Sequence, residues 1–204
     1  LKGERWIRTT LPTFAVAMAM KQIGLLAVTR DDVRSFLCTV NGIWHKNSHF
    51  RAIRAFYNWL EKEGKIPISP CYKMQAPKTP KLVLPRPKLS EIRQLIDLAP
   101  CARDKALISL MADTGFRKYE IAQIQLRDIR WDSRTIKVMG KGAKERIGRF
   151  SDTTEHYLKE HLASYSPNGN IWGIDYYGIG MVFQRLQKRT DIPCNPHSLR
   201  RAWA

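Results

Sequence analysis

A cluster of prolines near the middle of the chain limits its fold more than any other feature. Its members are Pro67, Pro70, Pro77, Pro80, Pro85 and Pro87, and lysines and arginines are interleaved with them. Proline lacks a backbone donor and fixes φ, so this spacing disfavours the interior of both helices and sheets. We therefore expect residues 77–87 to be an extended basic linker, rather than a loop within one domain. It would join a domain over residues 1–76 to a second one over residues 88–204.

Before the linker, apolar spacing predicts three helices. Residues 11–27 are rich in Ala, Met, Leu and Val, and Thr29 offers an N-cap for a second helix that ends near Val40. After the Asn41-Gly42 break, apolar residues recur at intervals of three and four up to Gly64, which predicts a third, amphipathic helix. The domain is thus expected to be helical.

The polar face of the third predicted helix is basic. It carries Lys46, Arg51 and Arg54, with His49 nearby. These cations either contact DNA phosphates or form an ordinary solvated face, and the pattern alone leaves both interpretations open.

After the linker, the pattern predicts several helices around one β-hairpin. Helices are expected over residues 90–98, capped by Ser90, and over 103–112, 119–126, 151–164 and 177–189, with a last one starting between Asn195 and Ser198. Residues 135–139 alternate as a strand, residues 140–142 turn, and residues 145–150 return. The expected fold class is mainly α with a small antiparallel β-sheet.

The chain is strongly basic in both halves. It has 35 Lys and Arg against 18 Asp and Glu, a formal charge of +17. Before Pro80 there are 13 basic and 5 acidic residues, giving +8, and after it 22 and 13, giving +9. An anionic partner is expected. Six Trp, seven Tyr and seven Phe favour folded domains over a basic tail.

The sequence indicates neither a metal site nor a membrane segment. The four cysteines form no CxxC pair, so reduced thiols in a cytoplasmic protein are expected. The spacings of Cys194 with His197 and of His45 with His49 lack the second pair that a tetrahedral metal site needs. No apolar run approaches the roughly 18 residues of a membrane span. Because the chain starts at Leu1 and ends where a helix has just begun, we expect it to be a fragment.

Three short segments contain the residue types that handle a phosphodiester. They are TGFRKYEI at residues 114–121, GKGAKER at residues 140–146 and PHSLRR at residues 196–201. Arginine presents a planar fork to phosphate oxygens, lysine is a mobile proton donor, and histidine moves protons near neutral pH. Arg117 is expected at the junction of two helices, and His197 and Arg200 on one face of a third.

In this order and spacing, the three segments resemble the tyrosine recombinase (phage integrase) family. The resemblance implies that Arg117, Lys141, His197 and Arg200 are catalytic and that Glu120 supports the site. Lys141 is preferred to Lys144 because the first lysine of the family's GKGxKxR hairpin is the catalytic one. The DNA-binding candidates are Lys46, Arg51, Arg54, Lys81, Lys144 and Arg146. Tyr119 and Ala202 depart from the family, which often has a small residue at the first position and Thr or Ser at the second.

The resemblance also implies an architecture and a reaction. A helical core-binding (SAM-like) domain and an α+β catalytic domain would clamp double-stranded DNA, with a tetramer as the working homo-oligomer. A tyrosine would attack the phosphodiester to form a 3′-phosphotyrosyl link in site-specific recombination or integration, without metal or cofactor. A cytoplasmic, nucleoid-associated protein of a mobile element is implied.

The family's nucleophile is expected roughly 30 residues after the arginine of the HxLR motif. All seven tyrosines of this sequence precede His197. We therefore expect the chain as given to bind DNA without cleaving it. The alternatives are a non-catalytic DNA-binding or regulatory protein on a recombinase scaffold, and a basic RNA-binding protein in which the motifs are accidental.

Overall fold

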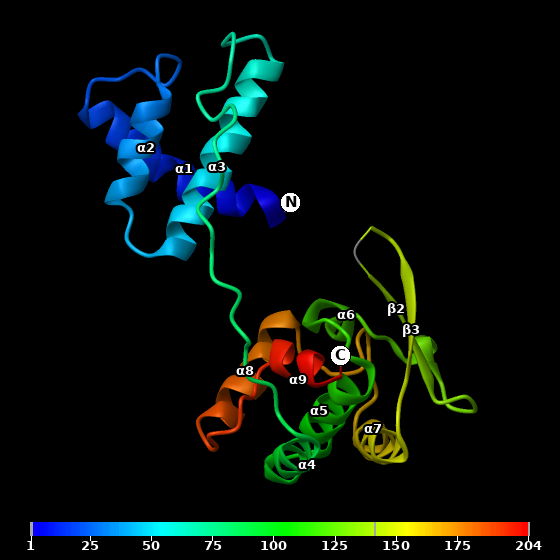
Figure 1. Cartoon of the computed structure of the whole chain (residues 1–204). Helices are drawn as coiled ribbons and strands as arrows, with labels where there is room; N and C mark the ends of the chain where they lie inside the picture. The colour runs from blue at the N-terminus through cyan, green and yellow to red at the C-terminus, as the bar shows by residue number, and fades with distance from the viewer. Residues whose placement is uncertain (1, 141, 204) are drawn as a thin grey trace. The chain divides into compact units, whose positions relative to one another are not determined.

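A computed structural model describes residues 2–140 and 142–203, with side chains from Ile7 onward. The chain divides into two compact units, one up to Leu82 and the other from Val83 (Figure 1). Residues 74–88 have no regular secondary structure. The three motifs all belong to the second unit.

Three helices form the first unit in its described residues: α1 (Lys2–Met20), α2 (Arg30–Thr39) and α3 (Ile43–Lys62). The ring of Phe14 meets those of Phe36 and Tyr57 edge to face, at centroid distances of 5.0 and 6.2 Å. These rings are almost fully buried. Aromatic burial of this kind dominates the energy of a small helical core.

The predicted cap of α2 is confirmed, whereas the predicted bounds of α1 are wrong. The Thr29 hydroxyl accepts from the Asp32 N–H, and the Thr29 N–H donates to the Asp32 carboxylate. We expected the first helix over residues 11–27, but α1 ends at Met20. Gln22 adopts a left-handed conformation with φ of 58°, and the Ile23 N–H returns to the Met18 carbonyl. This helix end carries no glycine, so the composition did not reveal it.

His49, which the sequence places near the basic face of α3, packs against the neighbouring helix α2. Its ring packs edge to face on Phe36 at 5.4 Å. Burial is the main cause of a lowered pKa for this imidazole. His49 is therefore a half-buried residue whose lowered pKa favours the neutral imidazole at neutral pH.

The second unit contains six α-helices and a three-stranded sheet among its described residues (Figure 1). The helices are α4 (Leu89–Leu98), α5 (Ala102–Thr114), α6 (Lys118–Ala122), α7 (Asp152–Ser164), α8 (Tyr176–Gln187) and α9 (Pro196–Trp203). The strands are β1 (Ile129–Arg130), β2 (Thr135–Met139) and β3 (Glu145–Arg149). Helix α5 is central, because it packs against α4, α7, α9 and β3.

The predicted hairpin is confirmed and gains a third strand. β2 and β3 pair antiparallel from Thr135 opposite Arg149 to Met139 opposite Glu145. β1 pairs with β2 on the other side through Ile129 and Ile136. The sheet order is β1-β2-β3. A two-residue strand is too short to show an alternating pattern in the sequence.

One helix start and one helix length differ from expectation. α4 starts at Leu89, because the Glu91 carboxylate accepts from the Lys88 N–H at 2.6 Å, so Ser90 is not its cap. α6 ends at Ala122 instead of continuing to residue 126. The Ile124 carbonyl instead accepts from Ile171, in a non-local pairing. α9 starts at Pro196, within the expected range, and the Asn195 side chain accepts from the N–H groups of the second and third residues of the helix.

All four cysteines are free, as the sequence predicted. Burial raises the pKa of Cys71 to about 11 and that of Cys194 to about 12, so both thiols are protonated at neutral pH. No helix in the described part of the chain combines the length and the apolar character required to cross a bilayer.

A buried histidine holds the loop after α7 against the core. The His161 ring stacks parallel to Tyr165 at 5.2 Å and lies 6.5 Å from the Trp172 ring, with Nε2 2.8 Å from the Ile171 carbonyl. Trp172 in turn donates to the Ile121 carbonyl in α6 at 2.8 Å. The stack therefore supports the short helix that follows Arg117.

We predict that acidification destabilises the chain through His161. Burial is the main cause that lowers the pKa of this imidazole below its ordinary value of 6.5. At a pH between the lowered pKa and about 6.5, the unfolded chain therefore binds more protons at this residue than the folded chain does. Stability should therefore fall as pH drops below about 6.5, and His161→Gln should flatten this slope in urea unfolding between about pH 7.5 and 5.5. His156→Gln is the control, since that side chain is 71% exposed. Equal slopes for His161→Gln and wild type would contradict the prediction.

Candidate phosphate-binding site

The site begins at the backbone corner that ends α5. Gly115 has φ of 56° and ψ of 24°, and its N–H donates to the Met111 carbonyl. This left-handed conformation favours glycine. A Cβ at Gly115 would also lie 2.8 Å from the Trp203 ring, so α9 closes on the corner. Arg117 follows as the N-cap of α6, which confirms its predicted place between two helices.

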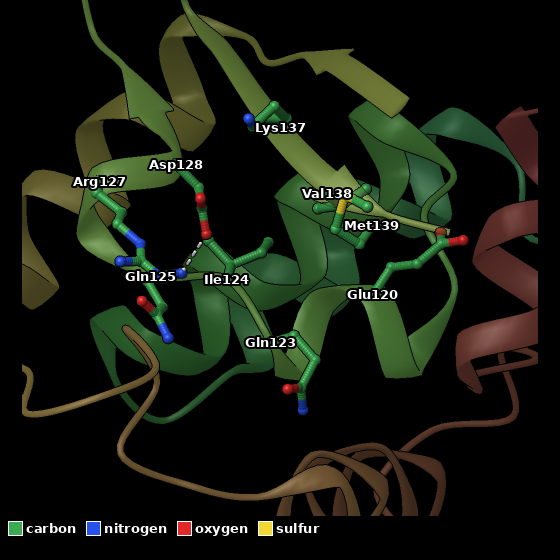
Figure 2. Close-up of a pocket in the computed structure, with 9 residues that line it drawn as sticks. All are labelled: Glu120, Gln123, Ile124, Gln125, Arg127, Asp128, Lys137, Val138 and Met139. Atoms are coloured by element: carbon green, nitrogen blue, oxygen red, sulfur yellow. Dashed lines mark hydrogen bonds between the residues drawn. The ribbon is translucent and has the colours of Figure 1, made fainter. Parts of the chain in front are cut away.

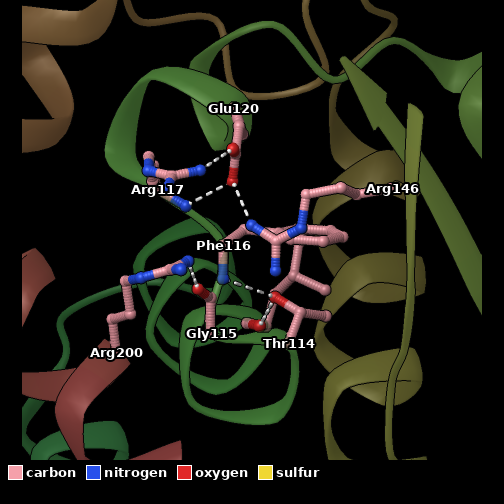
Figure 3. Close-up of polar contacts among 8 residues, drawn as sticks. Thr114, Gly115, Phe116, Arg117, Glu120, Arg146 and Arg200 are labelled. Atoms are coloured by element: carbon pink, nitrogen blue, oxygen red, sulfur yellow. Dashed lines mark hydrogen bonds and ion pairs between the residues drawn. The ribbon is translucent and has the colours of Figure 1, made fainter. Parts of the chain in front are cut away.

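Glu120 fixes the orientation of Arg117 (Figure 3). Its carboxylate accepts from the Arg117 N–H at 2.7 Å and from Arg117 Nη1 at 2.8 Å. The Glu120 side chain is only 2% exposed, whereas that of Arg117 is 50% exposed. The buried acid thus holds one edge of the guanidinium and leaves the rest facing solvent.

The same carboxylate binds a second arginine from the hairpin. Arg146 Nη1 lies 3.2 Å from Glu120 Oε2. The Arg146 guanidinium also lies over the Phe116 ring, 5.6 Å from its centroid. The sequence assigned Arg146 to phosphate contact at the hairpin, and the structure places it beside Glu120, on β3 near the hairpin turn.

Gly148 lets the hairpin approach this closely. A Cβ there would lie 2.5 Å from the Phe116 ring and 2.7 Å from the Thr114 methyl group, closer than atoms can pack. Sequence analysis missed this residue. The available signal was an isolated glycine inside a strand pattern, which indicates a close approach of another group.

Arg200 reaches the corner from α9. Its Nη1 donates to the Gly115 carbonyl, and the side chain is half-buried (Figure 3). Burial lowers the pKa of Arg200, the positive charges of Arg117 and Arg146 lower it further, and Glu120 opposes them. Arginine nevertheless stays charged at any physiological pH. Three guanidinium groups therefore surround one carboxylate.

Glu120 remains ionised in this setting. Burial opposes its charge, but hydrogen bonds from Arg117 and the charges of Arg146 and Arg117 hold its pKa below the usual value. The four side chains carry a net charge of +2 at neutral pH, because three are cationic and one is anionic. Such a cluster favours a polyanionic ligand.

Of the other two expected catalytic residues, the structure describes only His197. His197 is exposed one turn before Arg200, and its N–H donates to the Asn195 side chain. Lys141 lies outside the described residues. Lys144 is exposed, and its carbonyl accepts from Gly140 across the hairpin end at 2.8 Å.

The remaining DNA-binding candidates belong to the first unit. On α3, Arg51 is exposed, Lys46 is half-buried, and Arg54 lies 5.2 Å from the centroid of the Phe50 ring. Lys81 is exposed in the segment without regular structure. Among the candidates in the described part of the chain, the structure brings together Arg117, Glu120, Arg146 and Arg200.

The arginine side chains of the cluster are partly exposed to solvent. A nearby cavity of about 170 Å³ has Glu120 in its wall, but Arg117, Arg146 and Arg200 do not line it (Figure 2). Among residues 2–140 and 142–203, no group of three or more His, Cys, Asp or Glu side chains is placed to hold a metal ion. An extended ligand suits this surface better than a small molecule, which would need a concave pocket.

Comparisons with protein families and with curated proteins both find similarity to recombinases. A model described as the phage integrase family matches residues 88–204. A tyrosine recombinase XerC from Mannheimia succiniciproducens is 30% identical over 182 residues, which cover 80% of this chain and 62% of that protein. The chain thus spans about three fifths of the length of the curated relatives it matches first.

Two solved structures share the fold at low identity. A lambda integrase(75-356) dimer bound to a COC′ core site has a TM-score of 0.72 at 15% identity, over 96% of this chain and 81% of that one. A XerH recombinase bound to a palindromic difH substrate has a TM-score of 0.71 at 19% identity, over 94% of this chain and 64% of that one. Together with the observed elements, these likenesses confirm the expected fold class.

We predict that Glu120→Ala destabilises the chain by about 2 kcal/mol. It removes the acceptor of hydrogen bonds from two arginines and leaves three cations facing one another. The matched control is Glu145→Ala on the hairpin that carries Arg146. The Glu145 side chain is 60% exposed and pairs with Lys137. That change should cost at most about 1 kcal/mol. Equal losses in urea unfolding would show that Glu120 does not organise the cluster.

Proposed function

Because this chain belongs to the phage integrase family of tyrosine recombinases, we propose that it binds duplex DNA and activates a phosphodiester for site-specific recombination. The observation that carries the proposal is the set of three guanidinium groups around the buried Glu120 carboxylate. The Glu120 carboxylate holds Arg117 and Arg146, and the Gly115 carbonyl holds Arg200, but one acid cannot neutralise three cations. A phosphodiester supplies the missing negative charge.

Arg117 and Arg200 would bind the nonbridging oxygens of the reacting phosphate. These oxygens gain negative charge as phosphorus becomes five-coordinate. Donors that are already oriented stabilise that charge, and loss of one such donor typically raises a barrier by about 2.7–4 kcal/mol. Glu120 acts through Arg117 and Arg146, as a positioning residue.

Lys141 and His197 would move protons. Lys141 would protonate the 5′-oxygen that leaves, and His197 would assist proton transfer at the attacking tyrosine and contact the phosphate. The covalent 3′-phosphotyrosyl link conserves the energy of the phosphodiester, so neither ATP nor a metal ion is required. Since no tyrosine follows His197 in the 204 residues, we propose that they bind DNA without cleaving it.

The charge distribution supports DNA as the partner. Both halves of the sequence are basic, and Lys46, Arg51, Arg54, Lys81 and Lys144 would add phosphate contacts away from the reacting group. The lambda integrase and XerH structures are complexes with a core site and with a difH substrate. A homo-oligomer, a tetramer on DNA, is part of the proposal.

We predict that the chain binds a nicked suicide duplex without forming a covalent adduct. Binding would be followed by fluorescence anisotropy, and adducts by denaturing gel. Duplex RNA of the same sequence should bind more weakly. A covalent band would contradict binding without cleavage, whereas preference for RNA would overturn DNA as the partner.

In a longer form of the protein that contains the tyrosine, Arg117→Ala or Arg200→Ala should slow cleavage by about 10²–10³-fold, because each removes a donor to the reacting phosphate. Duplex affinity should change far less. Arg93→Ala, an exposed arginine on α4, is the control and should keep the cleavage rate. Equal losses of binding and cleavage in all three variants would favour a nonspecific basic binder.

A further inference from the structure

An aromatic ring on α8 holds the lysine that follows Arg117. Lys118 is the first residue of α6, and its ammonium nitrogen lies 3.6 Å from the centroid of the Tyr176 ring. A cation is attracted to an aromatic face within about 6 Å, so this is a close contact. Tyr176 is the first residue of α8. The side chain of Lys118 is therefore directed to α8, whereas that of Arg117 is directed to Glu120.

Gly180 provides the space that the ammonium occupies. A Cβ at this position would lie 3.1 Å from Lys118 Nζ, which is tighter than ordinary packing. Glycine inside a helix weakens it relative to alanine, so a glycine at the fifth residue of α8 needs a reason. The close approach of Lys118 to the α8 backbone supplies one.

The charge of Lys118 has no carboxylate partner among the described residues. Two other lysines of this unit are neutralised, Lys137 by Glu145 at 3.1 Å and Lys159 by Glu155 at 2.6 Å. The Tyr176 ring attracts the ammonium but carries no net charge. Lys118 thus adds a positive charge beside Arg117 and the other guanidinium groups, which already outnumber the Glu120 carboxylate.

We propose that Lys118 binds a DNA phosphate next to the one bound by Arg117, and that Tyr176 positions it for this contact. Phosphates follow one another along a strand with an axial rise of about 3.4 Å, so two consecutive residues at the start of α6 can serve neighbouring phosphates. The ring occupies one side of the ammonium, which has three donors, and leaves the others for phosphate oxygens. The inference rests on the proposed function, because it needs a phosphodiester at Arg117.

The test is the salt dependence of duplex DNA binding by the full chain. Lys118→Met should lower the magnitude of the slope of log affinity against log salt by about 0.9, the value for one lost phosphate contact. If both chains converge at 1 M salt, this corresponds to about eightfold weaker binding at 0.1 M. Tyr176→Leu should change the slope in the same direction, and Tyr176→Phe, which keeps the ring, should not.

The chain offers a matched control in Lys105 on α5. Its ammonium lies 5.2 Å from the Tyr157 ring on α7, so Lys105→Met removes the same charge from a similar contact away from Arg117. That variant should keep the wild-type slope, as should Lys118→Arg. Thermal unfolding verifies that each variant is folded.

The outcomes separate the inference from the proposed function. An unchanged slope for Lys118→Met, or an equal change for Lys105→Met, would overturn the role of Lys118 and leave DNA binding intact. If wild type binds no duplex, the proposed function fails and the inference fails with it. If the Lys118→Met variant does not fold, the test is the comparison of Tyr176→Leu with Tyr176→Phe. Equal salt slopes for these two variants would overturn the inference.

Discussion

The buried carboxylate of Glu120 is the interaction on which the site depends. A carboxylate that is 2% exposed is stable as an anion only when hydrogen-bond donors compensate its lost hydration. Arg117 and Arg146 supply these donors from two elements distant in the sequence. The acid therefore fixes the start of α6 and the turn end of the hairpin relative to each other.

Two glycines allow the backbone segments of the site to pack as closely as this arrangement requires. At the Gly115 corner, the carbonyl accepts a hydrogen bond from Arg200, and the Trp203 ring packs against the Cα. Gly148 allows β3 to lie on Phe116 and Thr114. The site is thus rigid on the protein side and charged on the solvent side. Preorganised cations of this kind bind a phosphate without a further free-energy cost for orienting their side chains.

Local signals in the sequence predicted much of the fold and of the site. The caps at Thr29 and Ser151 and the Gly115 helix end depend on a few neighbouring residues, and the structure contains all three. The hairpin was predicted from its alternation and its turn. Arg117 was placed at a helix junction because it comes two residues after the glycine that ends α5, and its role was predicted from the resemblance of the TGFRKYEI segment to the family.

The features that sequence analysis missed depend on residues far apart in the chain. α6 stops early because Ile124 pairs with Ile171, and the contact of Lys118 with Tyr176 joins α6 to α8. The contact of His49 on α3 with Phe36 on α2 was not predicted, because it joins two helices. The period of a helix shows that it has two faces, but the face that packs on the core depends on its tertiary neighbours.

The most direct measurement follows the arginine Nε–Hε resonances of the chain by ¹⁵N-edited NMR during titration with duplex DNA. If the cluster around Glu120 is the phosphate site, the signals of Arg117 and Arg200 shift early and saturate together. Arg103, which pairs with Asp104 at 3.0 Å on α5, should stay in place. Unchanged Arg117 and Arg200 signals while the duplex binds would contradict the assignment of the site.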